Sequence, residues 1–271
     1  MPELPEVETV RSVLLPYVVG QKIINTTISL PKVVANLNPQ TFITKMQGQS
    51  ITDFTRRGKF LTLHLDSGAF VVIHFRMTGT LIVENAETSP AKHTHLRLTF
   101  ANGQELRYND SRGFGHWWYF APDQPDTSGQ QLLGPEPEAV TVEYLRVKLT
   151  KRQAPIKTLL LDQHIIAGIG NIYADEICFR TQIRPDRQGS SLTSAELARL
   201  ATTIPAVIHE FIQIHKVPFA VFATSQSKSY QKSTNRAVYG RKGEPCQKCG
   251  HPLSGTRIGQ RSSVFCAHCQ K

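Results

Sequence analysis

Two Cys-x-x-Cys turns near the C-terminal end constrain the fold of this chain more than any other feature of its sequence. Cys246 and Cys249 form the first turn, and Cys266 and Cys269 form the second after sixteen intervening residues. Four thiolates at this spacing complete a tetrahedron around Zn²⁺ and leave no position open for water. The spacing therefore predicts one structural zinc ion, which orders a tail too small to bury a core of its own. Two disulfides or four free thiols are the alternatives.

The charge balance points to a polyanionic partner. Among 271 residues, Lys and Arg number 31 against 21 for Asp and Glu, which gives a formal net charge of +10. Such an excess is typical of proteins that bind nucleic acid, although a basic protein without that role is the alternative. No apolar run approaches the roughly 18 residues that span a bilayer, and the N-terminus starts acidic, unlike a secretory signal. We therefore expect a cytoplasmic protein with no membrane partner.

The hydrophobic pattern changes along the chain from helix to strand and back to helix. Residues 3–18 carry apolar side chains at helical spacing. Residues 21–122 alternate and are broken by Asn-Gly-type turns, which is typical of antiparallel hairpins in a sandwich or barrel, and short strands are expected at 51–60 and 61–65. The Pro- and Gly-rich residues 121–137 indicate a linker. Helical patterns follow at 142–151, 156–164, 171–180 and 194–215, and a polar loop is expected at 223–235.

The N-terminus offers a candidate nucleophile. Loss of Met1 would leave Pro2 with a secondary amine, which can attack C1′ of a damaged nucleoside and form a Schiff base. Glu3 and Glu6 follow closely in the sequence and could transfer protons, as could Lys59. A proline at the second position and carboxylates at a helix start also occur without any catalytic role, so the residues alone leave both interpretations open.

Five segments together resemble the formamidopyrimidine-DNA glycosylase family. They are 2–10 (PELPEVETV), 57–59 (RGK), 110–115 (DSRGFG), 168–176 (GIGNIYADE) and the cysteine tail, where Arg261 stands five residues before Cys266. They occur in the family's order and run from Pro2 to Gln270. The resemblance implies a two-domain α+β fold. An N-terminal catalytic β-sandwich with a leading helix would cover 1–133, a helical helix–two-turn–helix domain would cover 134–235, and a four-cysteine zinc finger would cover 236–271.

The same resemblance implies base-excision repair by a bacterial monomer. The enzyme would remove oxidised purines from double-stranded DNA and cleave the strand at the abasic site by β,δ-elimination. Pro2 would be the Schiff-base nucleophile, Glu3 the general acid that assists opening of the deoxyribose, and Glu6 a supporting residue. Lys59 would donate a proton in the β-elimination, and Arg261 would serve the δ-elimination and bind phosphate. DNA would lie in a basic cleft between the domains, and its binding would weaken steeply with salt.

Further residues at matching positions would contact DNA. An enzyme that attacks C1′ must extrude the nucleotide from the stack and fill the void. Met77, Arg112 and Phe114 match the family's wedge for this task, with core packing of Met77 and Phe114 as the alternative. The remaining expected DNA contacts are His93, Arg152, Lys157, Asn171 and Tyr173.

One segment departs from the family pattern and leaves the lesion preference open. Residues 217–222 (VPFAVF) stand where family members that excise 8-oxoguanine well carry a Gly-, Ser- and Thr-rich loop start. An endonuclease VIII-like glycosylase for oxidised pyrimidines is one alternative function. A non-catalytic, zinc-bearing sensor of DNA damage is another, because the charge and the zinc tail suit it equally. The set Pro2, Glu3, Lys59 and Arg261 argues against the sensor, since binding of phosphate does not need it.

Overall fold

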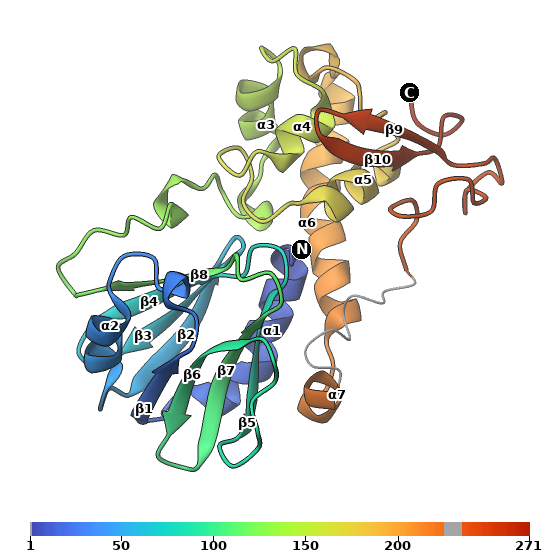
Figure 1. The fold of residues 1–271 in the computed structure, drawn as a ribbon. Coiled ribbons are helices and arrows are strands. Elements are labelled where there is room, and N and C mark those ends of the chain that lie inside the picture. The colour runs from blue at the N-terminus through green and yellow to red at the C-terminus, as the bar shows by residue number, and fades with distance from the viewer. Residues whose placement is uncertain (1, 225–234) are drawn as a thin grey trace. The chain divides into compact units, whose positions relative to one another are not determined.

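The computed structural model describes residues 2–224 and 235–271. They divide into two compact units, the first formed by 2–131 with 215–224 and the second by 132–214 with 235–271. Figure 1 shows the elements of each unit. Among the described helices, none combines the length and the apolar character that a membrane span requires.

The first unit is a sandwich of two four-stranded antiparallel sheets, with strand orders β1-β6-β7-β5 and β2-β3-β4-β8 (Figure 1). Its core lies between the sheets, where side chains of both sheets form one buried apolar cluster. This confirms the predicted antiparallel sandwich. The strands are β1 (Ile23–Ile28), β2 (Ile51–Arg57), β3 (Phe60–Leu65), β4 (Phe70–His74), β5 (Gly79–Asn85), β6 (Thr94–Phe100), β7 (Gln104–Asp110) and β8 (His116–Phe120).

The leading helix α1 (Leu4–Val18) is part of the sandwich core. Its residues Val7, Val10 and Leu14 recur at helical spacing and are fully buried in the same cluster as the strands. The helix contacts β2 of one sheet and β5 of the other. The N-terminal residues are therefore held by both layers of the unit.

Two details of the first unit differ from the sequence prediction. A helix, α2 (Pro39–Met46), interrupts the expected β region, and the Asn38 side chain caps it by accepting a hydrogen bond from Thr41 N at 2.8 Å. Asn followed by Pro is a helix-start signal that could have revealed it. The predicted strand 51–60 is also too long, because β2 ends at Arg57 and Phe60 already begins β3.

The second unit is helical and ends in a β-hairpin. It contains η3 (Pro137–Ala139), α3 (Val142–Leu149), α4 (Ile156–Leu161), α5 (Asn171–Arg180), η4 (Gly189–Ser191), β9 (Ser254–Ile258), β10 (Arg261–Phe265) and α6 (Ser194–His215) up to Ile214. The short η2 (Gln130–Leu132) lies at the boundary of the units. The bounds of α5 and α6 agree with the sequence prediction, whereas α3 and α4 end earlier than expected. Thr193 caps α6 together with Glu196, through hydrogen bonds in both directions.

A last helix, α7 (Phe219–Thr224), belongs to the first unit and contains residues 219–222 of the segment that departs from the family pattern. Phe222 is fully buried in the sandwich core, and Phe219 stacks on Tyr17 of α1 with ring centroids 4.0 Å apart. The loop expected at 223–235 is wrong for its first two residues, which end this helix. Residues 225–234 of that prediction lie outside the described residues, and Asn235 lies in no helix or strand.

Candidate catalytic and DNA-binding sites

The candidate nucleophile directly precedes two buried carboxylates at the start of α1, those of Glu3 and Glu6. Pro2 and Glu3 are buried, and Glu3 is the N-cap of the helix. Glu6 Oε2 accepts a hydrogen bond from the backbone N–H of Glu3 at 2.8 Å, in a capping-box arrangement. The residue after Pro2 is thus fixed through both its backbone and its side chain.

Lys59 lies in the tight turn between β2 and β3. The turn requires Gly58, whose φ of 55° lies in the left-handed region. Arg56, just before the turn, pairs with Glu8 of α1 at 2.8 Å, and α1 packs against β2. This pair holds the turn against the N-terminal half of α1. Lys59 itself is buried, with 8% exposure.

The wedge residues lie on two loops of the first unit, 75–78 and 111–115, which we call the wedge loops. Met77 is 37% exposed and Phe114 is 45% exposed, so the alternative of core packing is wrong for both. The Arg112 guanidinium lies over the Phe114 ring, 4.8 Å from its centroid. An exposed aromatic and an exposed thioether are costly in water, and they are suited to insertion between bases.

Asp110 organises the second wedge loop. Its carboxylate accepts hydrogen bonds from the backbone N–H groups of Arg112, Phe114 and Gly115 at 2.8–3.1 Å. The Tyr108 hydroxyl donates another at 3.0 Å, and the Thr78 hydroxyl of the first wedge loop donates to it as well. Burial would raise the pKa of Asp110, but these donors outweigh burial and lower it.

The wedge-loop surface includes His93. His93 is exposed and lines a surface pocket of about 250 Å³ together with Thr78, Asp110 and Ser111. Sequence reasoning named His93 but missed Asp110 as an organising group, because only the tertiary structure brings its donors together.

Three expected phosphate contacts belong to the second unit, and two of them are exposed. Arg152, in the loop before α4, and Arg261, the first residue of β10, are exposed. Asn171 begins α5, and its Oδ1 has no hydrogen-bond partner among the described residues. Helix N-termini bind anions through their first N–H groups, and the side-chain NH₂ group of Asn171 is a further donor at this place, whereas its Oδ1 is an acceptor and adds nothing toward an anion.

Lys157 and Tyr173 require a correction. Both side chains are fully buried, so neither is presented to DNA. Tyr173 packs edge-on against Phe211 with ring centroids 5.0 Å apart. Lys157 Nζ lies 2.8 Å from Asp175 Oδ1 and donates to the backbone carbonyl of Ser262 at 2.6 Å. These contacts give both residues a structural role inside the second unit.

Two adjacent carboxylates of α5 attach the C-terminal segment to the helical unit. Asp175 accepts hydrogen bonds from Ser263 Oγ at 2.7 Å and Val264 N at 3.1 Å, and so holds β10. Glu176 accepts from the backbone N–H groups of residues 237–239 at 2.9–3.0 Å. The sequence assigns no role to either carboxylate beyond its place in the 168–176 motif, because their partners are more than 60 residues away in the chain.

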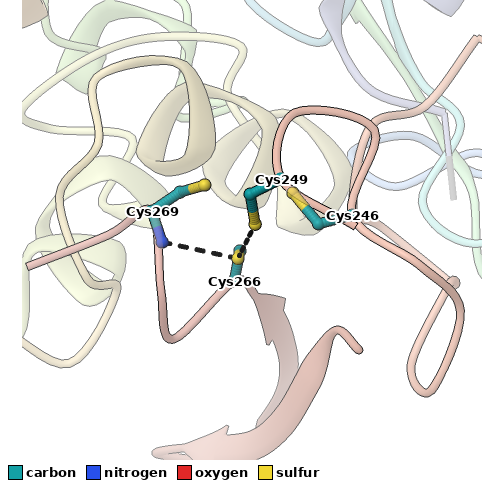
Figure 2. Close-up of side chains that lie close together, drawn as sticks. All are labelled: Cys246, Cys249, Cys266 and Cys269. Atoms are coloured by element: carbon teal, nitrogen blue, oxygen red, sulfur yellow. Dashed lines mark hydrogen bonds between the residues drawn. The ribbon is translucent and has the colours of Figure 1, made fainter. Parts of the chain in front are cut away.

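The four cysteines of the tail converge, as Figure 2 shows. Their Sγ atoms all lie within 4.8 Å of one another, and Cys249 Sγ is 3.5 Å from Cys266 Sγ. Backbone N–H groups of Lys248 and Cys269 point at sulfur atoms at 3.4 Å, which suits thiolate ligands. The donor set fits a closed tetrahedral site, so the tail holds one structural zinc. The fifth cysteine, Cys178, does not belong to this site and is fully buried in α5.

Comparison with known proteins identifies the class. Three family models match: the formamidopyrimidine-DNA glycosylase N-terminal domain over 1–117, the H2TH domain of the same glycosylase over 133–222, and the zinc finger found in FPG and IleRS over 243–271. Formamidopyrimidine-DNA glycosylases of Pelotomaculum thermopropionicum and Yersinia pestis are each 40% identical to the whole chain, which covers 99% and 100% of them.

Solved structures agree with these sequence matches. The Lactococcus lactis formamidopyrimidine-DNA glycosylase bound to abasic-site DNA has a TM-score of 0.87 at 32% identity, with 99% of each chain covered. A MutM bound to DNA with carbocyclic 8-oxo-G has a TM-score of 0.88 at 31% identity, with both chains covered completely. The chain is a zinc-bearing DNA-repair glycosylase with lyase activity at abasic sites. It belongs to the formamidopyrimidine-DNA glycosylase family.

Proposed function

We propose that this chain excises formamidopyrimidines and other oxidised purines from duplex DNA through a Schiff base at Pro2. The observation that carries this assignment is the capping box of Glu3 and Glu6, which fixes the residue next to the amine. A nucleophile that must meet one carbon atom of a bound nucleotide gains rate from such fixed geometry.

The reaction balances with the groups at hand. The Pro2 amine forms a bond to C1′ as the glycosidic bond breaks, and the departing oxidised base takes the electron pair of that bond and the proton that the amine gives up. Glu3 protonates the ring oxygen as the C1′–O4′ bond opens, which leaves an iminium ion. Removal of a C2′ proton then expels the 3′ phosphate, and a second elimination expels the 5′ phosphate. Lys59 serves the first elimination and Arg261 the second.

The DNA-binding residues support this chemistry from both units. Met77, Arg112 and Phe114 would fill the void left by the extruded nucleotide, and His93 would contact the backbone nearby. Arg152, Asn171 and Arg261 would bind phosphates. In the domain division that we propose, 1–133 is the catalytic domain, 134–235 the helical domain and 236–271 the zinc finger, with 215–224 packed on the first unit. We also propose a monomer that works in the cytoplasm on chromosomal DNA.

Borohydride trapping tests the nucleophile. Zinc-loaded protein without Met1 should form a covalent adduct with an abasic-site duplex, and mass spectrometry should find it on Pro2. Pro2→Gly should still bind the duplex while trapping and strand cleavage fall severely. Pro5→Ala, which removes a proline from the same end of the helix but leaves the amine, is the matched control. No adduct from the unaltered protein would favour the non-catalytic damage sensor.

Lesion choice needs its own assay. We expect faster excision from duplexes that contain a formamidopyrimidine than from duplexes that contain dihydrouracil. The opposite preference would favour the endonuclease VIII-like alternative without affecting the role of Pro2.

A further inference from the structure

A histidine outside the expected site lies next to the Glu6 carboxylate, which fixes the residue after the candidate nucleophile. His215 is the last residue of α6 and belongs to the first unit. Its Nδ1 lies 3.7 Å from Glu6 Oε1, and the two side chains are only 2% and 5% exposed. The contact is therefore an inward-facing charge pair when His215 is protonated.

The two oxygens of the Glu6 carboxylate have separate tasks. Oε2 accepts the hydrogen bond from Glu3 N that helps to close the capping box, and Oε1 is directed toward His215. A carboxylate removed from water is costly unless nearby groups compensate its charge. An imidazolium at this distance supplies such compensation, and it acts on the same group that fixes the residue beside Pro2.

We infer that His215 is a positioning residue for the reaction at Pro2 and acts through Glu6. It compensates the buried Glu6 carboxylate, so that the capping box stays closed and the amine and Glu3 keep their places. The inference rests on the proposed role of Pro2.

The decisive measurement is the single-turnover rate of borohydride-trapped adduct formation on a saturating abasic-site duplex. His215→Gln keeps a polar side chain of similar size and removes the ring that can be protonated. We expect it to slow trapping about tenfold, in the usual range for coupled neighbouring residues, while the Kd for the duplex stays the same. His209→Gln is the matched control, because His209 is exposed on the same helix.

A double-variant cycle separates the proposed role from simple packing. Once Glu6→Gln has removed the carboxylate, His215→Gln should cause no further loss of rate. In His215→Ala, added imidazole should restore part of the trapping rate, which a mere packing defect would not allow. If His215→Ala does not fold, as judged by urea unfolding, the cycle with the two Gln variants decides.

The outcomes are distinct. The inference would be overturned if His215→Gln trapped the duplex as fast as the unaltered protein. It would also be overturned if His215→Gln lowered the trapping rate by the same factor with Glu6 present as in the Glu6→Gln variant. Failure of the unaltered protein to form any adduct would instead refute the proposed function.

Discussion

The Thr78 hydroxyl donates a hydrogen bond to the Asp110 carboxylate, and this bond joins the two wedge loops. Met77 precedes Thr78 in one loop, and Arg112 and Phe114 lie in the other. Because Asp110 also accepts three backbone hydrogen bonds from its own loop, one buried carboxylate sets the positions of all three wedge side chains.

Asp110→Asn should impair base excision more than strand cleavage. An amide replaces one acceptor oxygen by a donor, so at least one N–H of the loop loses its partner, at a cost of about 1.5–3 kcal/mol for a charged acceptor. We expect kcat/KM for excision of a damaged base to fall at least tenfold, with a smaller loss on abasic duplexes, where no base must be everted. Asp123→Asn, at an exposed position, is the control, and equal losses on both substrates would contradict the role of Asp110.

Lys157→Met should lower stability without changing the number of phosphate contacts. Burial raises the pKa of Asp175, and the Lys157 ammonium offsets part of that rise. Loss of one partner from a buried pair costs about 3–5 kcal/mol, which urea unfolding of the zinc-loaded protein would measure. Lys157→Met combined with Asp175→Asn should recover part of this loss. If the variant is as stable as the unaltered protein and its DNA binding depends less on salt, Lys157 contacts a phosphate directly, as the sequence predicted.

Cys249→Ser should release the metal. The tail has little core besides a small cluster around Val238, Leu253 and Cys266, so its order depends on zinc. We expect metal content, measured by atomic absorption, to fall from one zinc per chain to none, and tight binding of abasic DNA to be lost because Arg261 lies on the hairpin between the two turns. Cys178→Ala should keep its zinc. Retention of metal by the Cys249 variant would contradict the four-thiolate site.

Stability of the first unit should fall in mild acid because of His74. Burial lowers the pKa of His74 to about 3, and the positive charges of Arg76 and Lys59 contribute. The native ring stays neutral while the unfolded ring takes up a proton near its ordinary pKa of 6.5. The stabilisation is therefore complete above that pH and declines toward pH 3, by at most about 1.4 kcal/mol per pH unit. Urea unfolding between pH 7.5 and pH 5 should show this slope, and His74→Gln should flatten it. An unchanged slope in the variant would assign the acid sensitivity to other groups.

Local patterns predicted some elements well. The zinc site could be predicted from the sequence because near neighbours in the sequence form both thiolate pairs. The helices α5 and α6 could be predicted because their apolar spacing and end signals lie within each helix. The helix α2 was missed although Asn38 and Pro39 signal its start, since the surrounding alternation favoured strands.

Lys157 shows where such reasoning ends. A lysine in a basic protein that resembles a DNA-binding family is expected on the surface. The sequence around Lys157 does not show that its partner is Asp175 or that its ammonium donates a hydrogen bond to the backbone carbonyl of Ser262. The same holds for His215 and Glu6, which are 209 positions apart and meet only in the folded chain.

The sequence by itself determined the zinc tail, the order of sandwich and helices, and the candidate nucleophile with its motif partners, because these depend on spacing between near neighbours and on hydrophobic period. Only the tertiary structure decided which charged groups are buried and what they hold: Asp110 for the wedge loops, Asp175 and Glu176 for the C-terminal segment, and His215 beside Glu6. The free energy of a buried charge depends on the groups that surround it in space, and distant parts of the chain supply those groups.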